Sequence, residues 1–313
     1  MARLPPAEKL PLALRKNVRD EWENNKADLE AQLSDVLGAP WTIELNPLAI
    51  WPYHNDGYAK ESLGSCIKAY IEGAIYTLKY QAGKGGDAFK NEVNTICHAH
   101  VLTLDVETEQ PARFSYAGCD VDDAGRLSLL FTEKNLGSNI DSCCEESTLT
   151  KALNAAPSPS GVPLSYLVRM GIHNDYDTQI VAIREQIATL LDKPVEAVTL
   201  TPNFEANFAA LSASSSSSLR DDWQRVLPDF TRAYFDALAY QLKYIKTGED
   251  EMIREGVLEA VSTNEYAFRV VEKLKKETYN ECEIEDGVLY LQTTPEYFGS
   301  NIDQIASKLM DLL

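Results

Sequence analysis

The spacing of apolar residues in the first half of the chain predicts a mixture of helices and strands. Leu29, Leu33 and Leu37 recur at helical spacing and predict an amphipathic helix over 28–37. A short alternating segment follows at 41–45 and predicts a strand. The pattern then predicts a tyrosine-rich helix, a further helix and three strands, at 70–80, 87–97, 100–106, 114–121 and 127–131.

The second half repeats this order of elements. The same criteria predict a helix, a strand, two helices and three strands, at 180–191, 197–201, 234–244, 249–261, 266–271, 278–284 and 288–293. Turn residues at 122–125 and 285–287 separate the last two strands of each half, and their glycines allow the positive φ of a tight hairpin. Each half is therefore predicted to be an α-β-α-α-β-β-β-α unit of class α+β, in which helices cover an antiparallel meander sheet.

Short sequence matches between the halves indicate an internal duplication. The pentapeptide Gly-Ser-Asn-Ile-Asp occurs at 137–141 and again at 299–303, an offset of 162 residues. Tyr70–Tyr80 resembles Tyr234–Tyr244 at an offset of 164. The matches keep their order and their offsets differ by single residues, as loop insertions would cause.

The duplication defines the expected domain organisation. We expect a first repeat over 1–153, a linker over 154–163 and a second repeat over 164–313, because proline, serine and glycine dominate the linker. Two similar units can pack about a pseudo-twofold axis, as the subunits of homodimers do.

The repeated pentapeptide has a structural explanation. Ser138 and Ser300 are suited to cap a closing helix, with Asp141 and Asp303 three residues later. The alternative is an anion held at the start of that helix. The aspartates disfavour the anion, because their charge already occupies the positive end of the helix dipole.

Net charge excludes some classes of partner. The 313 residues include 29 basic and 48 acidic side chains, a formal net charge of −19, and both halves are acidic. Nucleic acids and anionic membranes are disfavoured, because both are bound mainly through basic side chains. We also expect no membrane span and no signal-peptide core, since no sufficiently long apolar run occurs.

The six cysteines show no disulfide framework, and two of them, Cys143 and Cys144, are adjacent. We interpret all six as reduced thiols, which predicts a cytoplasmic protein.

Two pairs of tyrosines are the first candidate ligand-binding residues. Tyr76 and Tyr80 lie four residues apart on one predicted helix, as Tyr240 and Tyr244 do on the other, beside the core face. Tyrosine combines an apolar ring with a polar end, which suits interfaces and pockets. The rings either pack across the interface between the repeats or line a ligand cleft there.

A cluster of histidine and cysteine suggests a second candidate site. His98 and His100 are expected on one face of a strand, and Cys119 could approach them across the sheet. These three side chains would then serve as metal ligands, or as the acid and base of an enzyme. Structural zinc sites commonly show two Cys/His pairs at fixed spacing, whereas only one such pair is present here. The alternative is that His98 and His100 are structural residues at the start of a strand, with no metal-binding or catalytic role.

The sequence contains no nucleophile elbow, phosphate loop or dinucleotide motif. We therefore expect a cytosolic, non-catalytic binding or interaction protein with a protein or small-molecule partner. The alternative is an enzyme or small-molecule binder that uses His98, His100 and Cys119 in a cleft between the repeats. The sequence assigns no cofactor, substrate or oligomeric state.

Overall fold

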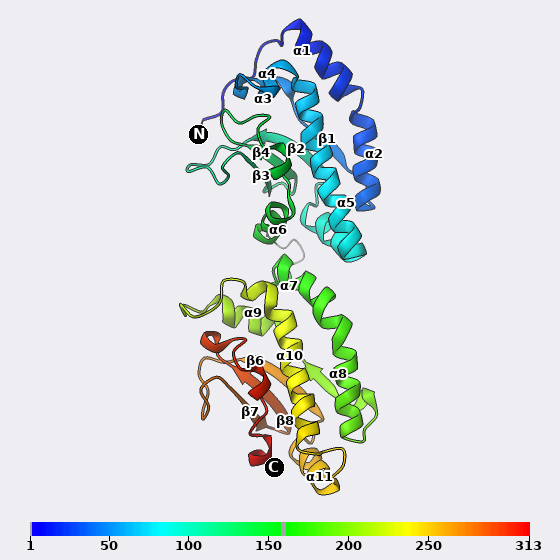
Figure 1. The fold of residues 1–313 in the computed structure, drawn as a ribbon, viewed down its shortest axis with the longest axis vertical. Coiled ribbons are helices and arrows are strands. Elements are labelled where there is room, and N and C mark those ends of the chain that lie inside the picture. Colours follow the sequence, from blue (N-terminus) through cyan, green and yellow to red (C-terminus); the bar gives the residue numbers. More distant parts are fainter. Residues whose placement is uncertain (1, 158–160) are drawn as a thin grey trace. The chain divides into compact units, whose positions relative to one another are not determined.

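The chain forms two compact units of class α+β, Met1–Val162 and Pro163–Leu313. A computed structural model describes residues 2–157 and 161–313 (Figure 1). Of the predicted linker at 154–163, residues 158–160 lie outside the described residues. Asn154 and Ala155 belong to the last turn of helix α6, so the start of the predicted linker is wrong.

The first unit begins with helices, and three of its four strands follow one another directly in the chain. Its helices are α1 Leu12–Asn17, the π-helix η1 Val18–Glu23, α2 Lys26–Leu37, α3 Pro47–Ile50, η2 Trp51–Tyr53, α4 Tyr58–Glu61, α5 Leu63–Ile96, η3 Ile140–Ser142 and α6 Glu146–Ala155. Its strands are β1 Thr42–Glu44, β2 Val101–Val106, β3 Ala117–Val121 and β4 Leu127–Phe131.

The sheet of this unit is mixed, so the predicted antiparallel meander is wrong. The strand order is β1-β2-β4-β3: β2 pairs in parallel with both β1 and β4, and only β3 and β4 are antiparallel. The connection at 107–116 is too long to act as a tight hairpin, and it carries β3 to the sheet edge. The predicted hairpin at 122–125 does join β3 to β4. β4 is buried along its whole length, as an inner strand should be.

The second unit repeats this arrangement of the sheet. Its strands are β5 Thr199–Thr201, β6 Glu265–Val270, β7 Asn280–Glu285 and β8 Val288–Thr293, in the order β5-β6-β8-β7 with only β7 and β8 antiparallel. Its helices are α7 Tyr166–Gly171, the π-helix η4 Ile172–Tyr176, α8 Asp177–Leu190, η5 Val195–Ala197, α9 Phe204–Ser212, α10 Trp223–Tyr244, α11 Glu251–Ala260, η6 Pro295–Tyr297, η7 Ile302–Gln304 and η8 Leu309–Leu312.

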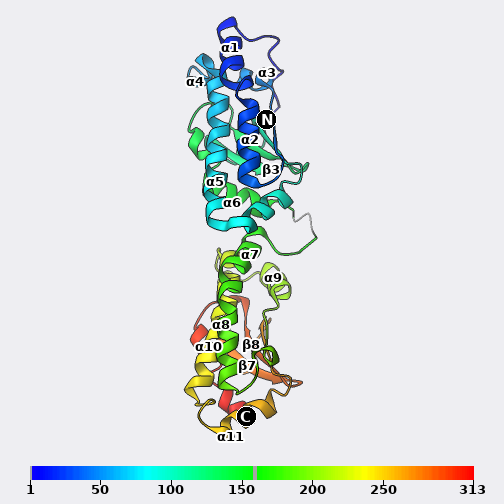
Figure 2. The same ribbon diagram turned by 90° about the vertical axis from the view of Figure 1, so that its right-hand side faces the viewer.

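In each unit a pair of helices runs side by side next to the sheet (Figures 1 and 2). In the first unit the pair is α2 and α5, and in the second it is α8 and α10. The predicted apolar faces are buried, including Ile71, Ala74 and Leu78 of α5. Gly86 adopts a left-handed backbone that kinks α5 and separates the two helices predicted at 70–80 and 87–97.

A glycine permits close helix contact in both units. The glycine lies on the long helix α5 in the first unit and on the short helix α7 in the second. In the first unit a Cβ on Gly64 of α5 would lie 2.4 Å from the carbonyl oxygen of Asn17. In the second, a Cβ on Gly171 of α7 would lie 2.9 Å from the ring of Pro228 in α10. Each crossing therefore has one position where only hydrogen fits without displacement.

The repeated pentapeptides form short 3₁₀ turns rather than the start of a regular helix, so the predicted serine caps are wrong. Asn139 and Asn301 precede the turns in a left-handed conformation, as do Gly137 and Gly299. The N–H of each glycine donates to a buried tyrosine hydroxyl, Tyr70 in the first unit and Tyr234 in the second, at 3.1 Å in both. The pentapeptide thus ties the end of the sheet to the long helix.

One face of the second sheet carries a charge network centred on Arg269. Its guanidinium donates to Glu285 at 2.8 Å and to Gln292 at 2.7 Å, and it lies 3.9 Å from the centre of the Tyr290 ring. The hydrogen bond from Arg269 lowers the pKa of Glu285 to about 2, whereas burial acts in the opposite direction. The network therefore favours the ionised form of Glu285.

This network is expected to make stability depend on pH in acid. Because the pKa of Glu285 is lower in the folded state, its contribution is present above about pH 4.5 and is lost as the pH falls towards about 2. Arg269→Met should flatten that part of the pH profile, measured by urea unfolding of the full chain between pH 5 and 3. Arg254→Met, on α11, is the matched control. Identical pH slopes for the Arg269 variant and the wild type would contradict this assignment.

Candidate functional site

The four predicted tyrosines lie on the exposed sides of α5 and α10. Tyr76 and Tyr80 are 74% and 51% exposed, and Tyr240 and Tyr244 are 63% and 71% exposed. Their helices bury the neighbouring apolar face instead. These rings are therefore available for contacts beyond the core of their own unit.

A hollow of about 330 Å³ lies beside the first pair of tyrosines. We call it the Tyr80 hollow; it is lined by Gly73, Tyr76, Thr77, Tyr80, Asp141, Glu145 and Glu146. The tyrosines come from α5, whereas the carboxylates come from η3 and the start of α6. All three carboxylate residues are exposed. Two aromatic rings and three negative charges therefore share one concave surface.

The ammonium group of Lys84 contacts both a ring and a carboxylate of this hollow. Lys84 Nζ lies 4.2 Å from the centre of the Tyr80 ring and 3.4 Å from Glu146 Oε2. The pKa of Lys84 is raised by its interaction with the Tyr80 side chain and by Glu146, although partial burial opposes the rise. A cation over a tyrosine ring is attracted by the negative face of the ring, and the carboxylate adds to that attraction.

The second pair of tyrosines has a different environment. The rings of Tyr240 and Tyr244 stack on each other, with centres 6.4 Å apart and planes 16° apart. At the pentapeptide offset of 162, Ser307 and Lys308 stand where the first unit has Glu145 and Glu146. The two glutamates of the first site therefore have no counterpart here.

The tyrosines were predicted as ligand residues from their spacing, whereas Glu145 and Glu146 were not, and Asp141 was predicted only to act at a helix start. Their approach to Tyr80 depends on how α6 is placed against α5, which no local sequence pattern specifies. The available signal was a difference between the halves: both keep the tyrosines, but only the first has the glutamates.

The structure places His98, His100 and Cys119 in three different surroundings. β2 begins at Val101, so the expectation that both histidines share a strand face is wrong. His98 is exposed and its ring lies against Gly125, where a Cβ would be 2.3 Å away. The His100 ring stacks on Trp41 with centres 5.6 Å apart, and its Nε2 lies 3.2 Å from the Asn94 carbonyl oxygen.

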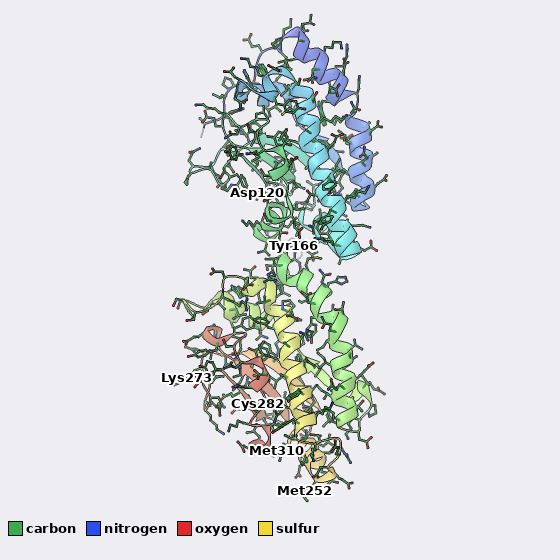
Figure 3. All side chains as sticks on the ribbon, viewed as in Figure 1. Asp120, Tyr166, Met252, Lys273, Cys282 and Met310 are labelled. Carbon is green, nitrogen blue, oxygen red and sulfur yellow. The ribbon has the colours of Figure 1, made fainter. Side chains whose placement is uncertain are left out.

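Cys119 is buried on β3 beside other thiols rather than beside a histidine. A hydrogen bond involving Cys144 raises the pKa of Cys119, and burial raises it further. Within residues 2–157 and 161–313, no three His, Cys, Asp or Glu side chains are gathered closely enough to hold a metal ion. All six cysteines are free and buried, including Cys282, labelled in Figure 3.

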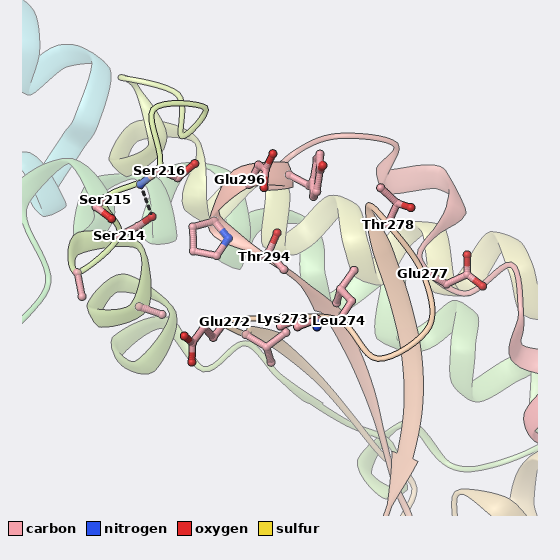
Figure 4. Close-up of a pocket in the computed structure, with 15 residues that line it drawn as sticks. Ser214, Ser215, Ser216, Glu272, Lys273, Leu274, Glu277, Thr278, Thr294 and Glu296 are labelled. Carbon is pink, nitrogen blue, oxygen red and sulfur yellow. Dashed lines mark hydrogen bonds between the residues drawn. The ribbon is translucent and has the colours of Figure 1, made fainter.

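A larger hollow of about 730 Å³ lies in the second unit (Figure 4). Three consecutive serines, Ser214, Ser215 and Ser216, line one side. Glu272, Glu277 and Glu296 add carboxylates, and Lys273 adds an ammonium group (Figure 4). The buried Thr294 hydroxyl has no hydrogen-bond partner among the described residues. The lining also includes apolar residues such as Val271 and Leu274, so this mixture of side chains does not indicate one class of ligand.

Comparisons of the chain with protein-family models, curated proteins and solved structures found no match. No helix in the described part of the chain combines the length and the apolar character needed to cross a membrane.

Proposed function

We propose that this chain is a binding protein whose Tyr80 hollow holds a basic side chain, lysine or arginine, from a segment of a partner protein. The observation that carries the proposal is the position of Lys84, whose ammonium group lies over the Tyr80 ring and beside Glu146. A basic group from a partner would compete for the same ring and carboxylates.

The expected strength of this site is modest. An exposed cation–π contact contributes about 0.5–1 kcal/mol, and an exposed ion pair contributes a similar amount. Each contact is therefore worth about a two- to fivefold change in affinity. Several basic residues along one segment would be needed for tight binding, and the net charge of −19 would speed their encounter at low salt.

The test is a binding titration with a fluorescein-labelled peptide of alternating lysine and serine, followed by fluorescence anisotropy. Tyr80→Ala and the double variant Glu145→Gln/Glu146→Gln should each weaken binding by about two- to fivefold or more. Lys84→Met should strengthen binding, because it removes the internal competitor. A role of Lys84 in folding alone would not produce that gain.

Matched controls separate the site from the general acidity of the chain. Tyr240→Ala removes another exposed ring, Glu196→Gln/Glu205→Gln removes two exposed carboxylates of the second unit, and Lys151→Met removes an exposed lysine of α6. None of these should change affinity by as much as its counterpart. Equal effects of the site variants and the control variants would reject the Tyr80 hollow as the binding site.

We also infer that the two units arose by duplication of one α+β fold. Three correspondences support this: the same strand order, a π-helix before α2 and before α8, and left-handed glycine and asparagine in both pentapeptides. On this view only the first unit kept or gained the two glutamates beside its tyrosines. The pseudo-twofold arrangement of the units stays a prediction.

A reducing, cytoplasmic location also remains a proposal. The six free cysteines support it, because structural disulfides are common in oxidising compartments and rare in the cytosol.

The alternative of an enzyme or small-molecule binder in a cleft between the units has less support. Its predicted residues His98, His100 and Cys119 contact Gly125, Trp41 and Cys144, respectively. Metal analysis of the purified full chain tests the metal version, for which stoichiometric zinc, iron or copper would be needed.

A further inference from the structure

The first unit carries a second concave surface, of about 1270 Å³, between α1 and α3. We call it the α1 groove. Its apolar lining includes Leu10, Leu12, Ala13, Val18, Pro47 and Leu48. Leu12 is 73% exposed, whereas Leu10 and Val18 are buried beneath the surface. An exposed leucine at the edge of a concave apolar surface is available to contact another chain.

The charge of the α1 groove is opposite to that of the whole protein. Its charged lining comprises four basic residues, Lys9, Arg15, Lys16 and Arg19, and two acidic residues, Glu8 and Glu23. Residues 1–20 likewise contain five basic and two acidic side chains, a local net charge of +3 in a chain of net charge −19.

Part of this positive charge is not neutralised within the unit. Lys16 and Arg19 both pair with Asp20, at 2.9 and 2.8 Å. Lys9 and Arg15 are exposed and form no ion pair with any carboxylate of the described residues. Lys9 and Arg15 therefore place two unpaired positive charges beside the apolar lining of the α1 groove.

We infer that the α1 groove binds an acidic amphipathic segment of a partner protein, with apolar side chains on Leu12 and Leu48 and carboxylates on Lys9 and Arg15. Charge complementarity selects this occupant, because a basic segment would meet the like charge of the four cations. The concave shape fits a helix laid along α1, as in other helix-in-groove complexes. This surface is separate from the Tyr80 hollow and takes a ligand of opposite charge.

An anionic membrane offers the same pair of properties, negative charge and apolar groups. The membrane is the weaker candidate, because a flat bilayer cannot enter a groove. In addition, the negative charge of the membrane would repel the rest of the protein surface, which has a net negative charge. Binding to anionic vesicles is therefore measured as a separate outcome.

The probe is a fluorescein-labelled 16-residue peptide with leucine at positions i, i+3, i+4 and i+7 of each helical repeat and glutamate elsewhere. Its binding to the full chain is measured by anisotropy. We expect Lys9→Glu/Arg15→Glu to weaken binding at least tenfold and Leu12→Ser to weaken it about threefold or more. The matched control Lys151→Glu/Arg254→Glu changes net charge by the same amount and should bind as the wild type does. A second peptide has lysine in place of glutamate. Its affinity for the wild-type chain should be no higher than its affinity for the Lys9→Glu/Arg15→Glu variant.

Four outcomes would overturn the inference. The first is that the wild-type chain does not bind the acidic peptide. The second is that the groove variant and the control variant lose the same amount of affinity for it. The third is that the chain binds vesicles containing 30% phosphatidylserine but does not bind the peptide. The fourth is self-association in sedimentation that the Lys9/Arg15 variant abolishes, which would make a second copy the occupant. Circular dichroism melting of each variant verifies that the exposed substitutions leave the fold intact.

Discussion

Gly64→Val is expected to prevent stable folding of the first unit. A Cβ at this position would lie 2.4 Å from the carbonyl oxygen of Asn17 and 2.7 Å from Cα of Val18. Both are backbone atoms, so α5 and η1 would have to separate. The N–H of Gly64 also donates to Asn17 Oδ1 at 2.7 Å, and separation would break this bond. Overpacking and the lost hydrogen bond together should cost about 3–5 kcal/mol, a large part of typical domain stability.

The measurement is urea unfolding of the full chain by circular dichroism, with hydrogen exchange to locate the loss. Exchange should accelerate in α2 and α5 and stay unchanged in α8 and α10, which serve as an internal reference. Gly73→Ala in the same helix is the control: its Cβ meets no atom within 4 Å, so this variant should be as stable as the wild type or slightly more so. If Gly64→Val unfolded at the wild-type urea concentration, the close crossing of α5 and η1 would be wrong.

Gly299→Ala is expected to destabilise the second unit by about 2–4 kcal/mol. Gly299 has φ of 85°, a conformation that costs other residues about 1–2 kcal/mol. In addition, its Cβ would lie 2.1 Å from the ring of Phe230, so the ring would have to move. The N–H of Gly299 donates to the buried Tyr234 hydroxyl, which prevents the turn from simply shifting away.

Gly137→Ala, the equivalent substitution in the first unit, should reduce stability less than Gly299→Ala does. Gly137 has nearly the same φ, 87°, but its Cβ would meet Cys66 Sγ at 3.2 Å rather than an aromatic ring. Gly137→Ala should therefore show mainly the backbone cost. Gly256→Ala, in helix α11 with an ordinary contact at 3.8 Å, controls for glycine replacement in the second unit. Thermal unfolding of the three variants tests the ranking; equal losses for Gly299→Ala and Gly137→Ala would refute the Phe230 clash.

The strands and the helices of the helix pairs follow closely from the sequence pattern, whereas the short helices α1, α3, α4, α7 and α9 were not predicted. β4 and β8 have the predicted bounds, because both are short apolar runs with a glycine turn in front. The strand order does not follow from local pattern. Whether β2 pairs with β3 or with β4 depends on where a ten-residue connection at 107–116 carries the chain, and alternation within a strand is the same for either partner.

The pentapeptide shows how a sequence signal can be recognised and its cause mistaken. Its repetition was detectable, and the helix-capping explanation used only neighbouring residues. The structure gives a long-range reason instead: the glycine N–H reaches a tyrosine hydroxyl 67 residues earlier in the first unit and 65 residues earlier in the second. A residue this distant in sequence gives no periodic signal.

For the Tyr80 hollow, the helical pattern was enough to place Tyr76 and Tyr80 beside the core face of a helix, because a 3.6-residue period fixes the side on which each residue lies. Only the tertiary structure brought Asp141, Glu145 and Glu146 to these rings, by placing η3 and α6 next to α5. The overall charge of −19 was likewise a property of composition, whereas the opposite charge of the α1 groove required four basic side chains to be set around one apolar surface. Secondary structure depends on neighbouring residues, but a binding surface depends on which distant segments the core packs together.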